Sequence, residues 1–165
     1  MILGQHCVGF DDTDLRFSSG CPDDYIDIYT NDVCEGIASG LFTYLAHPCY
    51  FMSARDEWNS HCSTAIEKIC QYSNIYNIPL EINLKGMDLG MVNYPSGPSY
   101  PYPNFNALPI FEKYQVQCVF GVDAHDPKKF RSMESKILQF FNETSDIHLN
   151  FVSDLPLINP VKQKK

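Results

Sequence analysis

The stretch VQCVFGVDAHDP at residues 116–127 predicts a buried strand, a polar strand end and the start of a helix. Its first half is an apolar run of the kind that forms a buried strand. Asp126 is placed to cap a helix whose first residue is Pro127. Because side chains alternate along an extended segment, we expect Asp123 and His125 to point to the same side. The stretch therefore predicts a carboxylate and an imidazole held together at the end of a strand.

Strand-like and helix-like segments alternate on either side of this stretch. The Gly- and Pro-rich segment 84–104 is predicted to be a long loop, of a length that usually serves function. The alternation predicts an α/β fold with a parallel sheet. The expected strands cover residues 2–10, 43–46, 78–82, 116–120 and 148–152, and a polar loop is expected over 11–24. The expected helices cover 33–42 (capped by Asn31 or Asp32), 56–74, 105–113 and a last segment whose core face carries Phe130, Met133, Ile137 and Phe141. The helix over 56–74 is expected to have one apolar stripe, formed by Trp58, Cys62, Ala65, Ile66, Ile69 and Cys70.

The composition of the 165-residue chain limits its class. Hydrophobic residues make up 44% and charged residues 19%, which is enough apolar content for one packed domain. The net charge of −8 argues against nucleic acid as the main partner. There is no run of 18 apolar residues and no signal-peptide pattern, so we expect a cytoplasmic protein that does not enter a membrane. The seven cysteines include no CxxC pair and are expected to be reduced and mostly buried.

Polar residues with ligand chemistry follow four consecutive predicted strands. In parallel sheets and barrels the carboxyl ends of the strands meet at one edge, where active sites collect. Imidazole and carboxylate are ligands that zinc, manganese and iron prefer. The sequence therefore predicts a metal site at this edge, formed by His6, His47, Asp123 and His125. Glu81 and Asn83 also lie at these strand ends.

Structural roles are the alternative for several of these residues. A single buried histidine more often forms a hydrogen bond in the core than it binds a metal. Glu81 either binds metal or holds a neighbouring loop, and Cys49 is expected to pack rather than to bind. His61 and His148 are assigned to structural or solvent-facing positions. Other catalytic schemes lack support, because the sequence has no GxSxG, Walker A or GxGxxG motif.

Four short motifs occur in an order that resembles a known family. They are GQH at residues 4–6, AHP at 46–48, LEIN at 80–83 and VDAH at 122–125. In this order, and at predicted strand ends, they are similar to the PHP (polymerase and histidinol phosphatase) domain family. The likeness is greater to its histidinol-phosphatase branch than to its polymerase-associated branch. It covers residues 1–142, and residues 143–165 are expected to form a terminal strand and a flexible tail.

The resemblance implies the C-terminal part of a distorted (β/α)7 PHP barrel with mostly parallel strands. It also implies divalent metal ions (Zn, Mn or Fe) at the carboxyl ends of those strands, where a metal-bridged hydroxide attacks a phosphate ester. Carried over to this sequence, the implied residues are the metal ligands His6, His47, Asp123 and His125 and the phosphate-binding candidates Lys85 and Arg55.

The function that the resemblance implies is hydrolysis of a small phosphorylated metabolite, in the first place of histidinol phosphate to histidinol and phosphate. The family opens with an HxH motif that this sequence lacks, so we expect the first βα units to be absent and the activity to be reduced. The alternatives are a catalytically incompetent fragment, a subunit completed by another chain, and a protein-tyrosine phosphatase or nuclease. The first strand, around residues 2–8, is then expected to be an edge that promotes self-association or binding of a missing half.

Overall fold

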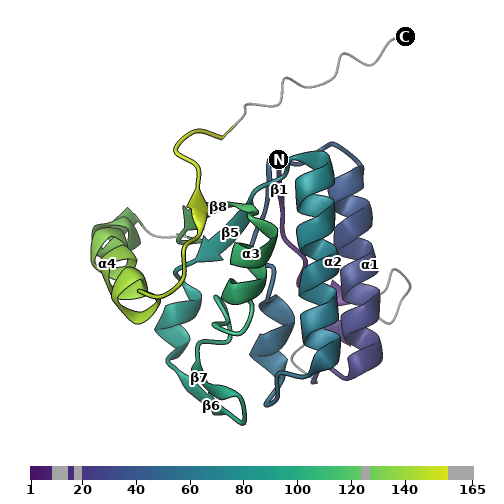
Figure 1. Ribbon diagram of the computed structural model, residues 1–165, viewed down its shortest axis with the longest axis horizontal. Coiled ribbons are helices and arrows are strands. Elements are labelled where there is room, and N and C mark those ends of the chain that lie inside the picture. Colours follow the sequence, from purple (N-terminus) through teal and green to yellow (C-terminus); the bar gives the residue numbers. More distant parts are fainter. Residues whose placement is uncertain (9–14, 17–19, 124–126, 156–165) are drawn as a thin grey trace.

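The computed structural model describes residues 1–8, 15–16, 20–123 and 127–155. In these ranges the chain has a mixed α/β fold with a five-stranded main sheet, two small two-stranded sheets and four α-helices (Figure 1). His125 and the tail at residues 156–165 lie outside the described residues, so the predictions for them stay predictions.

The main sheet confirms the predicted parallel α/β class. Its strands are β1 (Ile2–Leu3), β4 (Tyr44–Leu45), β5 (Leu80–Asn83), β8 (Gln117–Gly121) and β9 (Asn150–Phe151). They follow one another in the sheet in chain order, and every neighbouring pair is parallel. As far as the structure describes the chain, the sheet ends at β1 and β9 and does not close into a barrel.

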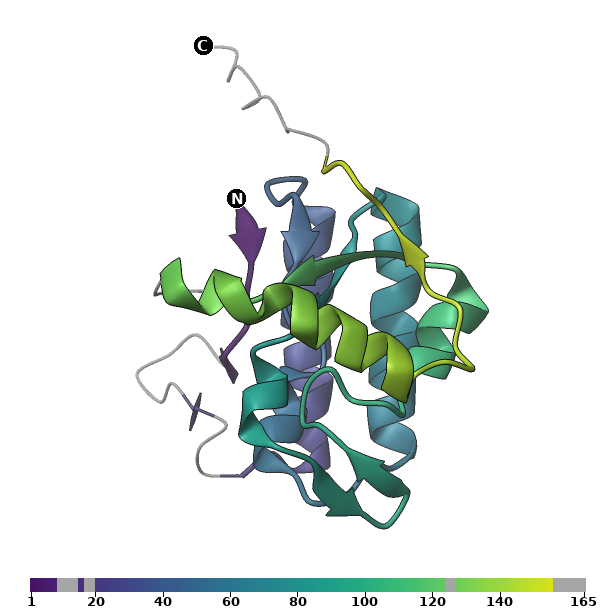
Figure 2. The same ribbon diagram turned by 90° about the vertical axis from the view of Figure 1, so that its left-hand side faces the viewer.

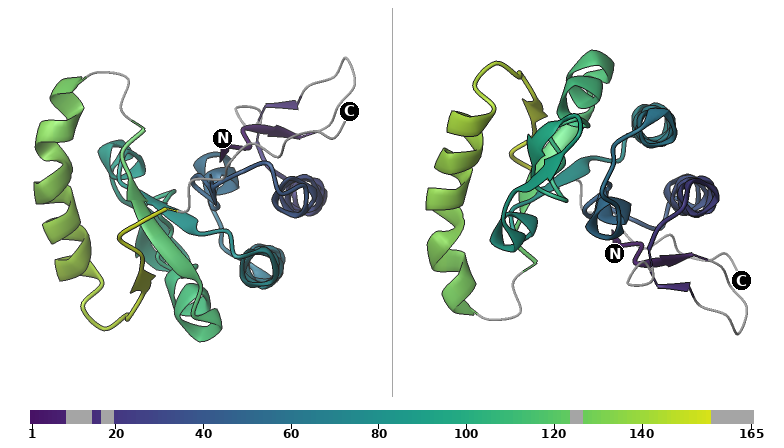
Figure 3. Two further views of the ribbon diagram at one scale, coloured as in Figure 1. Left: turned by 90° about the horizontal axis from the view of Figure 1, so that it is seen from above. Right: turned by 90° about the horizontal axis from the view of Figure 1, so that it is seen from below.

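Helices cover both faces of the main sheet. They are α1 (Asp23–Ala38), α2 (Ser60–Tyr76), α3 (Leu108–Tyr114) and α4 (Met133–Glu143). Helices α1 and α2 pack side by side on one face, and α4 crosses the other face (Figures 2 and 3). The core between helices and sheet holds side chains with at most 2% exposure, among them Ile26, Val33, Ile37, Ile66, Ile69, Leu80, Ile82 and Phe111.

Helix α1 begins ten residues before the position predicted for it. The prediction of a cap at Asn31 or Asp32 was wrong, because both residues lie within the helix. The predicted loop ends two residues early, since Asp23 and Asp24 are also helical. Asp23 and Asp24 occupy its first turn, where carboxylates favour the helix dipole. Within the same stretch, Ile26 and Tyr29 are fully buried and supply the apolar face.

The bounds of α2 are set by its two caps. The side chain of Asn59 accepts hydrogen bonds from the backbone N–H groups of His61 and Cys62, so the helix starts at Ser60 rather than near residue 56. Asn77 follows the helix with a left-handed φ of 54°, a common way to end a helix. The predicted apolar stripe of this helix is confirmed by the burial of Cys62, Ala65, Ile66, Ile69 and Cys70.

The segment predicted as a long loop contains regular structure. It holds the 3-10 helix η3 (Gly86–Leu89) and the antiparallel hairpin of β6 (Val92–Tyr94) and β7 (Gly97–Ser99). Gly97 adopts a φ of 120°, which suits glycine and turns the chain between the two strands. The hairpin was missed because its Pro and Gly residues are typical of loops.

The predicted core face of the last helix was wrong in part. Phe130 and Phe141 are 59% and 46% exposed, whereas Phe140 is buried against Phe120 with ring centroids 5.7 Å apart. Phe130 belongs to the 3-10 helix η4 (Pro127–Ser132), which precedes α4. Because a 3-10 helix has three residues per turn, the helical phase changes at this junction. Met133 and Ile137 are partly buried against the core, as predicted.

The predicted first strand is divided into two. Strand β1 is followed by Gly4, Gln5 and His6, and β2 (Cys7–Val8) then pairs antiparallel with β3 (Leu15–Arg16). Strand β1 lies at an edge of the main sheet, which confirms the predicted edge position. A short 3-10 helix, η2 (Tyr50–Ala54), follows β4. None of the helices in the described ranges is long and apolar enough to cross a membrane.

Candidate functional site

His47 is buried just beyond the carboxyl end of β4. Its backbone has a φ of 34°, in the left-handed region that non-glycine residues rarely adopt. The backbone N–H of His47 donates a hydrogen bond of 3.0 Å to Oε2 of Glu81, which lies on the neighbouring strand β5. An unusual main-chain conformation of this kind persists where its surroundings hold it. Strand β5 therefore fixes the position of His47.

The imidazole of His47 is neutral near pH 7. Burial, and to a smaller extent the nearby His6, lower the pKa of His47 to about 4. Its Nδ1 is the buried side-chain nitrogen or oxygen that lacks a hydrogen-bond partner in the described part of the chain. A neutral imidazole with a lone pair to offer is the form that binds metals.

His6 lies beside His47, as predicted from the sequence. The two ring centroids are 4.7 Å apart and the rings are tilted by 56°. The ring of Tyr50 lies 4.7 Å from His6 and 4.8 Å from His47, and Tyr102 lies 5.8 Å from His47. A Cβ atom on Gly4 would be 3.5 Å from His6 and 3.7 Å from His47 Nε2. The loop after β1 thus brings one exposed and one buried histidine together.

Glu81 and Asn83 lie on β5 as a buried, hydrogen-bonded pair. Oε2 of Glu81 accepts from the side-chain amide of Asn83 at 2.8 Å as well as from His47. Burial raises the pKa of Glu81, and these hydrogen bonds act against that rise. A Cβ atom on Gly121 would come within 1.7 Å of Glu81 Oε1, so only glycine leaves room for the carboxylate. The alternative in which Glu81 holds a neighbouring loop agrees with these contacts.

Asp123 and Lys85 form an ion pair at the carboxyl end of the sheet. Lys85 Nζ lies 2.6 Å from Asp123 Oδ2, and both side chains are about one third exposed or more. Such a half-exposed pair contributes little to stability. Asp123 has a φ of 41°, so a second residue of this edge has a left-handed backbone. The structure thus brings the predicted cationic residue Lys85 to a predicted ligand.

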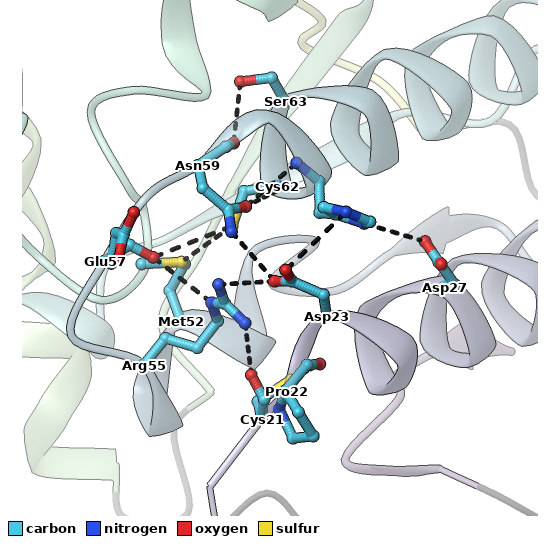
Figure 4. A network of polar contacts seen from close by, with 11 residues as sticks. Cys21, Pro22, Asp23, Asp27, Met52, Arg55, Glu57, Asn59, Cys62 and Ser63 are labelled. Atoms are coloured by element: carbon cyan, nitrogen blue, oxygen red, sulfur yellow. Dashed lines mark hydrogen bonds and ion pairs between the residues drawn. The ribbon is translucent and has the colours of Figure 1, made fainter.

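Arg55 lies in a different polar network. Its guanidinium forms an ion pair of 2.9 Å with Asp23 at the start of α1 and donates to the backbone oxygens of Cys21 and Glu57 (Figure 4). Asn59 also donates to Asp23, at 3.0 Å. These contacts tie the start of α1 to the start of α2. Arg55 is not among the residues that line the cleft at the sheet edge, so the structure does not bring it to the predicted phosphate site.

The structure also places His61, His148 and Cys49, which were not predicted to bind metal. His61 faces the carboxylates of Asp23 and Asp27, each at 3.8 Å, and His148 contacts Glu112 at 3.3 Å. Both agree with the structural or solvent-facing assignment. Cys49 is buried, in keeping with packing. Cys21, Cys34, Cys49, Cys62, Cys70 and Cys118 are all buried thiols.

A cleft of about 350 Å³ opens at the carboxyl ends of β4, β5 and β8. Phe130 of η4 and Met133 of α4 line its outer side. Its polar lining residues are His47, Glu81, Asn83 and Asp123, and its other lining residues are Ile2, Tyr44, Ala46, Phe120, Gly121, Val122, Phe130 and Met133. Four polar residues at adjacent strand ends therefore face one space that is large enough for a small ligand.

Sequence reasoning missed two tyrosines near these carboxylates. Burial raises the pKa of Tyr44, and burial raises that of Tyr102 to about 12, with the charges of Glu81 and Asp123 adding to both shifts. Tyr44 could have been found, because it lies two residues before Ala46 on the same predicted strand. Tyr102 comes from the Pro-rich segment after β7, and no sequence pattern predicts its return to this edge.

The side chains near the cleft are of the types that bind divalent ions, but in the described part of the chain too few of them lie together to complete a metal site. No cluster of three or more His, Cys, Asp and Glu side chains suited to a metal occurs in residues 1–8, 15–16, 20–123 and 127–155. The nearby donors are the imidazoles of His6 and His47 and the carboxylate of Asp123, which suit zinc, manganese or iron. The partnerless Nδ1 of His47 also fits such a role. His125, the fourth predicted ligand, lies outside the described residues.

Comparison of the chain with protein families, curated proteins and solved structures finds no match. Function is therefore inferred from the residues and geometry of the site.

Proposed function

We propose that the chain is a metal-dependent phosphoric monoester hydrolase of the PHP type, with a small metabolite such as histidinol phosphate as its substrate. The observation that carries this proposal is the meeting of His6, His47 and Asp123 near one cleft at the carboxyl edge of a parallel sheet. The sequential, parallel strand order is what the C-terminal part of a (β/α)7 barrel would have.

Each polar residue has a role in this proposal. His6, His47, Asp123 and His125 would hold divalent ions, which polarise a phosphoryl oxygen and lower the pKa of a bound water. His47 is already neutral and needs no deprotonation to bind. Lys85 does not line the cleft itself, but it pairs with Asp123, which does, and from there its charge would hold a phosphoryl oxygen. Arg55 has no part, because Asp23 and backbone oxygens occupy its guanidinium.

The cleft suits a small substrate better than a macromolecule. Its volume of about 350 Å³ lies at the low end of the range for small-molecule sites. Tyr44, Phe120 and Phe130 provide aromatic walls against which an imidazole ring can pack. The acidic composition disfavours nucleic acid. A phosphorylated metabolite with a planar ring matches both the walls and the charges.

A second candidate is a metal-binding chain without phosphatase activity, or a subunit completed by another chain. Two observations favour it. The sequence contains no HxH motif, and the described residues contain no cluster of three or more donors. Such a chain would bind an ion weakly and would not stabilise the charge of a phosphoryl group well enough for turnover.

The direct test is phosphate release by the purified full chain with Mn²⁺ or Zn²⁺, with histidinol phosphate and p-nitrophenyl phosphate as substrates. We expect metal-dependent turnover that chelation removes and that His47→Ala lowers by about 100-fold or more, because a lost ligand removes charge stabilisation. His61→Ala is the matched control, since His61 lies beside Asp23 and Asp27 and does not line the cleft. If the folded chain binds metal but releases no phosphate, the proposed phosphatase activity is wrong and the second candidate is supported.

A further inference from the structure

A continuous chain of hydrogen bonds joins the two ends of the candidate site. It starts at the His47 backbone N–H, which donates to Glu81 Oε2, and the Asn83 side-chain amide donates to the same oxygen. Oδ1 of Asn83 accepts from the backbone N–H of Lys85 at 3.0 Å. Lys85 Nζ then reaches Asp123. Two predicted metal ligands, His47 and Asp123, are therefore connected through Glu81, Asn83 and Lys85.

The carboxylate of Glu81 is fixed on both of its oxygens. Oε2 holds the two N–H groups of His47 and Asn83, and Oε1 lies against the backbone of Gly121, where a Cβ atom would approach it to 1.7 Å. Glu81 is only 4% exposed and Asn83 only 1%. Glu81 also lines the cleft, but the two N–H donors of His47 and Asn83 already engage its Oε2.

His47 needs such a fixed acceptor. Its φ of 34° is disfavoured for a residue with a side chain, so the chain would relax to another conformation if nothing held it. A hydrogen bond from a backbone N–H to a carboxylate is charge-assisted and stronger than a neutral one. The His47 backbone N–H donates to Glu81, and this bond links the strained residue to the central strand β5.

We propose that Glu81, supported by Asn83, is a positioning residue that holds the main chain of His47 so that its imidazole faces the metal site, and that it is not itself a ligand. This inference rests on the proposed function. Groups that orient ligands in this way commonly change metal affinity by about 10- to 100-fold when they are removed.

The test compares Glu81→Gln with Glu81→Ala in the full chain. Glutamine has the same shape as glutamate and keeps an oxygen that can accept from His47, but it is a poor metal ligand; alanine removes the acceptor. Glu112→Ala is the matched control, because Glu112 also accepts a backbone N–H, that of His148, at 2.9 Å and away from the cleft. The measurements are Mn²⁺ affinity by calorimetry and amide exchange of His47 by NMR in the metal-free protein.

The proposal predicts a clear order of affinities. Glu81→Ala should weaken Mn²⁺ binding about 10- to 100-fold and speed exchange of the His47 amide, whereas Glu81→Gln and Glu112→Ala should stay close to the unmodified chain. Equal losses in Glu81→Gln and Glu81→Ala would overturn the proposal by making Glu81 a ligand. Unchanged Mn²⁺ affinity in Glu81→Ala would also overturn it.

The two measurements separate this inference from the proposed function. One outcome is that the unmodified chain binds no Mn²⁺ while Glu81→Ala speeds exchange of the His47 amide. The proposed function is then wrong, and the positioning of His47 by Glu81 is supported. If the unmodified chain binds Mn²⁺ while the His47 amide exchanges equally in all variants, the metal site stands and the positioning role of Glu81 is wrong. Because Glu81→Gln preserves volume, it gives a folded protein for the comparison if Glu81→Ala does not fold.

Discussion

His47 couples the candidate site to stability at acid pH. Its pKa falls from 6.5 to about 4 on folding, so the unfolded chain binds a proton more readily than the folded chain. The free energy of unfolding must then decrease as the pH falls from about 6.5 to about 4, and this contribution is constant below that range. The full effect is about 3 kcal/mol.

We expect urea unfolding of the metal-free chain, with a chelator present, to show this loss between pH 7 and pH 4.5. In His47→Gln the pH dependence should be smaller, because glutamine does not titrate. Equal pH dependence in both proteins would mean that His47 is accessible to protons in the folded state.

Gly121 makes room for the Glu81 carboxylate, and its replacement tests that contact. Gly121→Ala should lower the free energy of unfolding by about 1–3 kcal/mol, because the new Cβ atom overlaps Glu81 Oε1. Gly4→Ala is the matched control: its Cβ atom would make ordinary contacts of 3.5 Å or more with His6 and His47. Chemical denaturation measures both. A Gly121→Ala protein as stable as Gly4→Ala would show that Glu81 moves away without cost.

Among the contacts between secondary-structure elements, those of Asn59 join helices α1 and α2. This residue caps α2 through His61 and Cys62 and donates to Asp23 at the start of α1. Asn59→Ala should therefore lower the free energy of unfolding by about 1 kcal/mol, as loss of an N-cap does. Asn31→Ala, inside α1, removes only an exposed hydrogen bond that Lys68 of α2 donates to Asn31 at 2.8 Å, and should therefore destabilise the protein less. Thermal or urea unfolding checks this, and equal stability of the two variants would contradict the capping role.

The elements that the sequence predicts well are those with a clear apolar period. The strands around residues 44, 80 and 118 and the stripe of α2 are confirmed because burial on these elements follows the apolar pattern. The start of α1 was missed because its Asp and Asn residues resemble a loop when their buried neighbours are not yet known. The face of α4 was wrong in part because η4 changes the helical phase before it.

The predictability of the site residues also depends on how directly the sequence pattern determines their position. His6, His47 and Asp123 were predicted because parallel strands end at one edge, which depends only on strand order. Arg55 was assigned to this edge by its charge alone, whereas the cap network of α1 and α2 holds it. Tyr102 could not be predicted, since its position depends on how the segment after β7 returns to His47.

For the whole molecule, the edge strand β1 predicts self-association. Met1 and Ile2 are 72% and 55% exposed, and Ile2 lines the cleft together with the exposed Phe130. An apolar strand edge of this kind pairs readily with another chain. We expect size-exclusion chromatography with light scattering to show concentration-dependent oligomers that Ile2→Lys reduces. Ile75→Lys, at an apolar position on α2 that is 71% exposed, should leave them unchanged. A monodisperse monomer at micromolar concentration would contradict this prediction.

The central claim is that His6, His47, Asp123 and His125 belong to one metal site. The most direct measurement is a crystal structure of the full chain grown with Mn²⁺ or Zn²⁺, with anomalous scattering to locate the ion. We predict an anomalous peak at the carboxyl edge of the sheet, with a nitrogen of His47 and a nitrogen of His125 each about 2.0–2.2 Å from an ion. A structure in which His47 and His125 lie on opposite faces of the sheet, with no ion between them, would contradict the account.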